Sequence, residues 1–310
     1  MAVARGAHDM TSWTRREWLS RFAITSISLL TAPRFLVSRL LAEEPQIIVS
    51  PLNKLSDEDE IELGRRLASI LEKEQPIVSN ATIVRYLEKL AAGLAAQSQR
   101  PSLPWSIKLI NSHEPNAFAL PGGFLYVSRG LIELIASEDE LAAAVAHEMG
   151  HVVARHAVNK VLRIFTAHSK LKPVLDNLDQ QNDVVEKIIV DLGGAAAMLA
   201  DFRFSLKEEG QADLLGFYEM LRAGWDPKGF LKLFARLEEL EKSSGGTPNS
   251  FLSAHPPTPE RADAIRHELT LVTVPASAAT NSVKFQGFKS AMGHLPEPPK
   301  TTDNQRPVSL

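Results

Sequence analysis

The sequence predicts an α+β fold that is mainly helical, with a small mixed sheet ahead of one central helix. Apolar residues recur at helical spacing on both sides of residues 105–128, whereas the alternation typical of strands is concentrated in that stretch. The chain has 310 residues, of which 44% are hydrophobic and 23% charged. These are the usual proportions for a globular protein with a sizeable core. We therefore expect one folded domain that contains both helices and a sheet.

Two helices are expected at the start of this domain, over residues 56–75 and 81–97. Ser56 followed three residues later by Asp59 is a variant of the capping box that begins a helix. The second helix should end before residues 98–104, which contain Ser, Gln and Pro. Both segments carry apolar residues at the spacing of one helical face, which indicates packing into the core: Ile61, Leu67, Ile70 and Leu71, then Ile83, Leu87, Leu90 and Leu94.

Three short strands are expected next. Residues 105–110 alternate between polar and apolar, and residues 117–120 and 124–128 flank a Pro-Gly-Gly turn. These segments predict a small sheet directly ahead of the central helix.

The central helix is predicted over residues 137–156, SEDELAAAVAHEMGHVVARH. Ser137 followed three residues later by Glu140 predicts a capping box, so the helix should begin near Glu138. Apolar residues then continue at helical spacing through the segment: Leu141, Val145, Met149 and Val152.

This helix carries the pattern HExxH, formed by His147, Glu148 and His151. Residues i and i+4 project from one face, so both imidazoles could bind one Zn²⁺ at about 2.0–2.1 Å. Glu148 lies about 100° around the helix from His147, beside the metal, where it can take a proton from a metal-polarised water. The chain has no cysteine, so a zinc site must use histidine and carboxylate ligands.

A third protein ligand is expected from the predicted helix over residues 204–223. Glu209 could complete a site of two histidines and one glutamate, and Asp213, one turn later, could accept the free ring N–H of a ligand histidine. Glu208 is the alternative ligand. Because Ser205 and Glu208 form a capping box, Glu208 has a structural role, and we favour Glu209.

Three motifs in this order resemble a known family. The HExxH pattern, the ExxxD pair of Glu209 and Asp213, and the upstream segment NAFALPGG (116–123) are similar to those of the HtpX and CAAX-prenyl-protease class of gluzincin metallopeptidases. The resemblance covers about residues 55–269. It implies a zincin-like fold, one Zn²⁺ per chain and hydrolysis of peptide bonds, with His147, His151 and Glu209 as ligands and Glu148 as the general base.

The resemblance has two departures. The family often has Ser-Arg ahead of the ligand glutamate, where this chain has Ser205-Leu206. The chain also has no array of membrane-spanning helices, so a prenylated substrate is not implied.

The resemblance also implies a substrate-binding strand through Asn116, Ala117 and Phe118. An edge strand can align an extended peptide by backbone hydrogen bonds, with little demand on its side chains. The alternative is a plain hairpin with no binding role. The expected substrates are misfolded or unassembled polypeptides of the cell envelope. Two rival functions are a chaperone or assembly factor that uses the same groove, and another zinc hydrolase such as an amidase of cell-wall peptides.

His255 is the last candidate site residue, and it precedes the prolines Pro256 and Pro257 in a segment that also resembles the family. Three roles are open: a donor to the oxyanion formed during hydrolysis, a resting ligand at the fourth zinc position, or packing beneath the proline turn. Surface or packing roles are expected for the remaining histidines, which are His8, His113, His156, His168, His267 and His294.

The rest of the domain is less distinctive. Residues 188–200 are apolar but too short and too interrupted to span a membrane, and we expect them to pack over the HExxH helix. A helix is expected over 228–242 and a polar loop over 243–250. A further helix to residue 269 should begin with Thr258 as its cap and Pro259 at its first position. A strand is expected over 282–288, and residues 296–310 are Pro-rich and polar, as in disordered segments.

Residues 1–42 are predicted to be a targeting segment, followed by a peptidase domain over 43–290 and a disordered tail over 291–310. Residues 14–19, TRREWL, resemble the twin-arginine export motif, and a short apolar stretch of about 11 residues follows. Export would place the chain in the periplasm. An uncleaved segment that anchors the chain at the membrane interface is the alternative. Removing residues 1–42 takes away six Arg, one Asp and one Glu, so the formal net charge falls from −3 to −7. This charge predicts no nucleic-acid partner.

Overall fold

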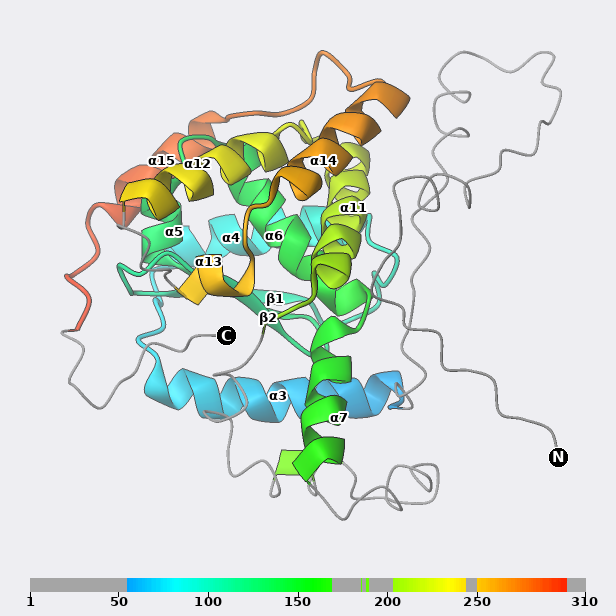
Figure 1. Cartoon of the computed structure of the whole chain (residues 1–310). Helices are drawn as coiled ribbons and strands as arrows, with labels where there is room; N and C mark the ends of the chain where they lie inside the picture. The colour runs from blue at the N-terminus through cyan, green and yellow to red at the C-terminus, as the bar shows by residue number, and fades with distance from the viewer. Residues whose placement is uncertain (1–54, 169–184, 186–187, 190–202, 244–249, 300–310) are drawn as a thin grey trace, which may run out of the picture. The chain divides into compact units, whose positions relative to one another are not determined.

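The computed structural model describes residues 55–168, 185, 188–189, 203–243 and 250–299. These residues form a helical domain built around a three-stranded sheet, as predicted (Figure 1). No helix among them is long and apolar enough to cross a membrane. The predicted targeting segment (1–42), most of the apolar segment 188–200 and most of the polar loop 243–250 lie outside the described residues.

The sheet is mixed, as the sequence predicted. Its strands are β1 (Ser106–Ile110), β2 (Ala117–Leu120) and β3 (Phe124–Ser128), in the order β1-β3-β2. β1 runs parallel to β3, and β2 runs antiparallel to it. Among the described residues β2 therefore forms one edge of the sheet. β2 and β3 have the predicted bounds, and β1 begins one residue later than expected.

The turn between β2 and β3 requires its two glycines. Gly122 and Gly123 have φ angles of 77° and 97°, which side chains with a Cβ rarely adopt. A Cβ on Gly122 would also lie 2.7 Å from the Cα of Ile61. The turn is also held by Glu60, whose Oε1 accepts the Gly122 N–H at 3.1 Å. This contact fixes the helix α3 (Asp57–Glu74) against the sheet.

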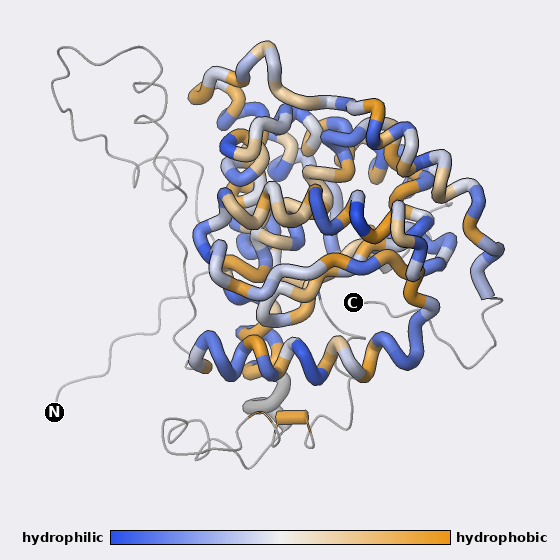
Figure 2. The backbone as a smooth tube through the Cα atoms, turned by 180° about the vertical axis from the view of Figure 1, so that it is seen from behind, coloured by the Kyte–Doolittle hydropathy of each residue, from blue (hydrophilic) through white to orange (hydrophobic). Residues whose placement is uncertain are grey.

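Alternate residues of each strand face two different helical layers. Ala117 and Ala119 lie in the core shared with α4 (Ala81–Ala95) and α6 (Glu138–Val153). Phe118 and Leu120 lie in the core shared with α3 and α7 (His156–His168). Figure 1 shows α3 on one side of the sheet and α4 and α6 on the other. Along α3, Figure 2 shows hydrophobic segments interrupted by hydrophilic ones, as expected for a helix with one buried face.

The central helix α6 begins at the predicted residue, but its predicted capping box is absent. The Ser137 hydroxyl accepts no backbone N–H. It donates to the carboxylates of Asp139 and Glu140 instead, and Glu140 Oε2 accepts the N–H of Ala136 at 3.2 Å. The acidic first turn therefore binds the cap residue's hydroxyl, which leaves that oxygen turned away from the helix.

Helix α11 (Leu206–Arg222) packs along α6 at unusually short range. A Cβ on Gly150 of α6 would lie 2.4 Å from the Ala212 carbonyl oxygen. A Cβ on Gly216 of α11 would lie 2.8 Å from backbone atoms of Ala146. Because both positions are glycine, the two backbones approach closely enough for their polar side chains to meet. The predicted capping box of Ser205 and Glu208 is present at the start of α11.

Together with α15 (Val283–Met292), four further helices complete the described domain. They are α5 (Arg129–Leu134), α12 (Gly229–Ser243), α13 (Ser250–Ala254) and α14 (Pro259–Leu271). α14 has the predicted Thr258 cap and Pro259 at its first position. The prediction of a strand over 282–288 was wrong, because α15 is a helix capped by Ser282. Its buried residues Phe285, Phe288 and Met292 recur at helical spacing, and Phe288 stacks on Tyr86 of α4.

Residues 291–299, which the prediction placed in a disordered tail, are partly structured. Residues 291–299 include the end of α15 and a segment that binds the domain through the Pro296 carbonyl. This oxygen accepts hydrogen bonds from Asn111 Nδ2 at 3.1 Å and Arg129 Nη1 at 3.0 Å. These two donors hold Pro296, which sequence composition alone assigned to a disordered tail. Residues 300–310 lie outside the described part of the chain.

Candidate metal centre

The two histidines of the HExxH pattern converge on one point beside α6. Every residue of α6 is buried, so the side chains of His147 and His151 are enclosed by protein. Their Nε2 atoms lie 3.1 Å apart. The helix therefore presents both ring nitrogens to the same place, as the i, i+4 spacing predicts.

Glu209 of α11 faces this point from the opposite helix. Its Oε1 lies 3.3 Å from His151 Nε2, and its Oε2 lies 3.4 Å from His147 Nε2. The carboxylate is fully buried. Glu208 instead accepts the backbone N–H of Ser205 at 2.9 Å, as a capping residue does. The structure thus brings Glu209, and not Glu208, to the histidines.

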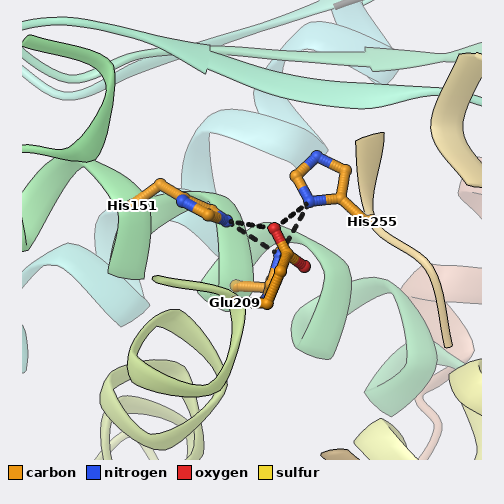
Figure 3. Close-up of side chains that lie close together, drawn as sticks. His151, Glu209 and His255 are labelled. Atoms are coloured by element: carbon orange, nitrogen blue, oxygen red, sulfur yellow. Dashed lines mark hydrogen bonds and ion pairs between the residues drawn. The ribbon is translucent and has the colours of Figure 1, made fainter. Parts of the chain in front are cut away.

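His255 follows α13 and completes the cluster. Its Nδ1 lies 3.0 Å from Glu209 Oε1 and 3.1 Å from His147 Nε2. Figure 3 shows the rings of His151 and His255 turned toward the Glu209 carboxylate, with dashed lines joining the three. His255 Nε2, on the other side of the ring, lies 3.5 Å from Oε1 of Glu148. His255 therefore belongs to the cluster and does not merely pack beneath the proline turn.

The four residues fit a zinc ion. One ligand atom from each of His147, His151, Glu209 and His255 lies within 4.8 Å of the others. The atoms that join His147 to the other two histidines, and Glu209 to all three, are 3.0–3.4 Å apart. Four ligands at about 2.0–2.1 Å from a tetrahedral zinc would be about 3.3–3.4 Å apart. Bare ring nitrogens and carboxylate oxygens repel one another at such separations unless a cation or a proton lies between them.

Asp213 holds His147 from behind, as predicted. His147 Nδ1 lies 2.8 Å from Asp213 Oδ1. Since an ionised carboxylate can only accept, Nδ1 carries a proton. When the ring is neutral, as a metal ligand must be, Nε2 then has its lone pair directed at the cluster.

Arg261 is a member of the site whose contacts sequence reasoning missed. Its Nε and Nη2 donate to the two oxygens of Asp213 at 2.7 and 2.8 Å, and its Nη1 lies 2.8 Å from Glu209 Oε2. The residue is only 5% exposed. The sequence placed Arg261 on the first turn of α14, in a segment that resembles the family, but no spacing rule connects it to residues on α11.

His156, for which we expected a surface or packing role, is buried in contact with a histidine of the cluster. Its Nδ1 lies 2.9 Å from His151 Nδ1. One straight helix through residue 156, as the sequence predicted, would turn the two rings about 140° apart. Instead, α6 ends at Val153 and Arg155 adopts a φ of 58°. This turn redirects the chain so that His156, at the start of α7, faces back toward His151.

The charges of the cluster favour a bound cation. Burial alone would lower the pKa of His147, but Glu209 and Asp213 raise it to about 10. Burial would raise the pKa of Glu209, but His255, Arg261 and His147 hold it well below its ordinary value. For His151 burial dominates and keeps its pKa well below the ordinary value, so that ring is neutral. The site therefore attracts positive charge while keeping one histidine in the form that binds a metal.

Glu148 lies beside the cluster and is not one of its four members. Its side chain is buried, and among the described residues its Oε1 accepts no hydrogen bond. Burial is the main reason that its pKa is raised. A carboxylate oxygen that accepts no hydrogen bond next to a metal site can accept a proton from a bound water or substrate.

The expected substrate strand lies at the edge of the sheet. Ala117 and Phe118 pair with Val127 and Tyr126 of β3 on one side, and β2 packs against α6. Asn116 precedes the strand, where its N–H donates to Ser128 Oγ at 2.8 Å. This edge thus lies next to the helix that carries His147 and His151.

Comparison with known proteins places this chain among metallopeptidases. The model of the family described as Peptidase family M48 matches residues 81–269, which include every residue of the cluster. The chain is 31% identical over 176 residues to the mitochondrial metalloendopeptidase OMA1 of Schizosaccharomyces pombe, covering 57% of this chain and 50% of that protein. It is 26% identical over 228 residues to the beta-barrel assembly-enhancing protease of Escherichia coli, covering 71% of this chain and 46% of that protein. The chain thus spans about half the length of these relatives.

Proposed function

The chain belongs to peptidase family M48, a family of zinc metallopeptidases, and from this premise we propose that it is a zinc-dependent endopeptidase. One observation carries the proposal. The buried Glu148, with an oxygen that accepts no hydrogen bond among the described residues, lies beside a cluster of four metal-ligand atoms. A purely structural zinc site would have no use for such a base.

We assign His147, His151 and Glu209 as the ligands that hold the zinc. A bound zinc ion would supply a Lewis acid that polarises the substrate carbonyl and acidifies water. Asp213 accepts the Nδ1–H of His147 and so keeps that ligand in the required tautomer. Glu148 takes the proton from the attacking water as a general base. The protonated carboxyl group then delivers this proton to the nitrogen of the leaving amine as a general acid.

His255 has the position of a fourth ligand in this arrangement. Its Nδ1 lies 3.0 Å from Glu209 Oε1 and 3.1 Å from His147 Nε2. The atoms of His147, His151 and Glu209 are separated by similar distances, 3.1–3.4 Å. A catalytic zinc site keeps its fourth position for water or substrate. We therefore assign His255 as a resting ligand that must leave this position before hydrolysis, in preference to the oxyanion-donor role.

We propose that substrates bind as an extended chain along β2, through Asn116, Ala117 and Phe118. A sheet edge recognises backbone N–H and C=O groups and places little demand on sequence. Such a groove suits misfolded or unassembled polypeptides, which expose extended segments. The names of two relatives, a mitochondrial metalloendopeptidase and a beta-barrel assembly-enhancing protease, are compatible with a role in protein quality control.

We place this activity in the cell envelope because of the twin-arginine-like motif at residues 14–19. On this proposal residues 1–42 direct export, and the peptidase domain begins at residue 43 and extends at least through Pro296. Peripheral contact with the membrane would follow if residues 1–42 stay attached.

The proposal is tested with Glu148→Gln, which removes the base but keeps the shape of the side chain. We expect zinc content and melting temperature to stay at the parental level while cleavage of casein falls by about 10²–10⁴-fold. A metal chelator should abolish the parental activity, and added zinc should restore it. Near-parental turnover in zinc-loaded Glu148→Gln protein would refute the assignment of the base and leave the chaperone function as the better proposal.

A further inference from the structure

The second ring nitrogen of His151 faces another histidine instead of a carboxylate. His151 Nδ1 and His156 Nδ1 lie 2.9 Å apart, a hydrogen-bond distance. Both residues are at most 2% exposed. Two neutral rings at this distance must divide the roles, so that one nitrogen donates its proton and the other accepts it.

Gln211 determines which histidine donates. Its side-chain oxygen Oε1 lies 3.1 Å from His156 Nε2. An amide oxygen can only accept, so His156 Nε2 carries a proton. The Nδ1 of a neutral His156 then has a lone pair, and His151 Nδ1–H donates to it. As a result, His151 Nε2 keeps its lone pair and points at the cluster, 3.1 Å from His147 Nε2 and 3.3 Å from Glu209 Oε1.

The plane of the His151 ring is also fixed. Phe204, just ahead of α11, stacks on this ring with a centroid separation of 4.0 Å and an interplanar angle of 27°. Stacking limits tilt of the ring, while the hydrogen bond to His156 limits its rotation. The two contacts together leave one orientation for Nε2.

The backbone turn at Arg155 places His156 in this position. A positive φ is unfavourable for a residue other than glycine, so the surrounding structure must hold Arg155 in this conformation. Arg155 Nη2 donates to the Leu55 carbonyl at 2.7 Å, and its Nε lies 2.8 Å from Oε2 of the buried Glu60. Strained backbone of this kind is concentrated at functional sites. If α6 continued straight, residue 156 would point away from the site. The turn at Arg155 ends α6, and His156 at the start of α7 therefore faces His151.

A neutral imidazole as the hydrogen-bond partner of His151 is consistent with the net charge of the buried site. Three carboxylates lie in or beside it: Glu148, Glu209 and Asp213. The two positive charges of a zinc ion and that of Arg261 would balance them. A carboxylate behind His151 would add a fourth negative charge to a buried site, whereas a neutral imidazole accepts the same hydrogen bond without adding charge.

We propose that His156 is a positioning residue that, with Gln211, holds His151 in the tautomer and orientation required for zinc binding. The inference rests on the proposed zinc site. If this is so, the two ligand histidines are oriented by hydrogen bonds to different kinds of partner. Asp213 orients His147, and the His156–Gln211 pair orients His151.

The test measures zinc affinity by competition with a fluorescent chelator, together with the melting temperature of the zinc-free protein. His156→Phe keeps a ring but removes the acceptor, and we expect it to weaken zinc binding by about 10–100-fold, the usual cost of losing such a partner. His156→Asn places an amide oxygen near the Nδ1 position, so it should retain most of the affinity. His267→Asn, at an exposed histidine of α14, is the matched control and should leave zinc binding unchanged.

Gln211 provides a second pair of variants that does not alter either histidine. Gln211→Glu keeps an oxygen acceptor and should bind zinc nearly as the parent does, whereas Gln211→Met removes the acceptor and should weaken binding. This pair decides the question if His156→Phe does not fold. Equal zinc affinity in the Gln211→Met and Gln211→Glu proteins would overturn the inference, as would equal losses in His156→Phe and His156→Asn.

One additional variant separates this inference from the proposed function. His151→Ala should nearly abolish zinc binding if His151 is a ligand. Parental zinc affinity in His151→Ala would refute the zinc site itself. Loss of zinc in His151→Ala with parental affinity in folded His156→Phe would refute only the role of His156.

Discussion

Replacing Arg261 by methionine should destabilise the zinc-free protein by a large and pH-dependent amount. Arg261 is a cation that faces two buried carboxylates of α11, through two hydrogen bonds to Asp213 and an ion pair with Glu209. Methionine fills much of the same space but carries no charge. The variant therefore leaves Glu209 and Asp213 buried with only the histidines as counter-charges.

The expected magnitude follows from the burial of all three groups. Arg261 is 5% exposed, Asp213 1% and Glu209 0%. Removing one partner of a buried ion pair typically costs about 3–5 kcal/mol, because an uncompensated charge stays behind. For a domain of this size each kcal/mol lowers the melting temperature by roughly 2–4 °C. We therefore expect a fall of about 6–20 °C for the zinc-free protein at pH 7.

The dependence on pH provides a second signature. Burial by itself would raise the pKa of Asp213, but the charge and hydrogen bonds of Arg261 and the hydrogen bond from His147 hold it below its ordinary value. A depressed carboxyl pKa stabilises the fold fully above the unfolded value, about 3.9 for Asp and 4.3 for Glu. That contribution is lost as the pH falls through the folded value. The stability gap between the parent and Arg261→Met should thus be widest above about pH 5 and narrow below about pH 4.

The assay is thermal unfolding of zinc-free protein followed by circular dichroism from pH 3 to pH 8. Arg266→Met is the control on the same helix, since the Arg266–Asp263 pair is exposed on both sides and should contribute less than about 1 kcal/mol. Arg261→Lys should fall between the two, because a lysine supplies one charge but cannot bridge both carboxylates as a guanidinium does. An Arg261→Met protein that melts with the Arg266→Met control at every pH would refute this account of the site.

Two further predictions concern the ligands. Glu209→Ala should lower zinc occupancy, measured by metal analysis, far more than Glu208→Ala, because only Glu209 faces the histidines; the reverse order would show that the ligand assignment is wrong by one residue. His255→Ala should raise the basal rate of peptide cleavage by zinc-loaded protein, since it opens the fourth position. A fall of about 10²–10³-fold would identify His255 as an oxyanion donor instead.

Local chemistry in the sequence was sufficient for the elements that carry the site. The HExxH pattern placed two histidines on one face of a helix, because the i, i+4 relation depends only on helical geometry. The capping box of Ser205 and Glu208 is similarly local, and it distinguished the structural Glu208 from Glu209 by sequence spacing alone. Strands β2 and β3 followed from alternation on either side of a Pro-Gly-Gly turn.

Predictions failed where a local pattern was compatible with two structures. The first turn of α6 offered Ser137 three acidic neighbours, and its hydroxyl donates to two of them instead of capping the helix. The segment over 282–288 has apolar residues that suit either period. Packing of Phe285 and Phe288 against Tyr86 selected the helix. In both cases the deciding contact was a side-chain interaction that propensity does not include.

The sequence by itself predicted the proposed ligands on α6 and α11 and the proposed base, because the HExxH and capping patterns depend on spacing along one helix at a time. Only the tertiary structure decided how the ligands are supported. Arg261 reaches Glu209 and Asp213 from another helix, and His156 reaches His151 through a single residue with positive φ. Neither contact follows from the periodicity of the sequence. The Arg261 contacts depend on how α14 packs on α11. The His156 contact depends on the break between α6 and α7, which the surrounding residues stabilise.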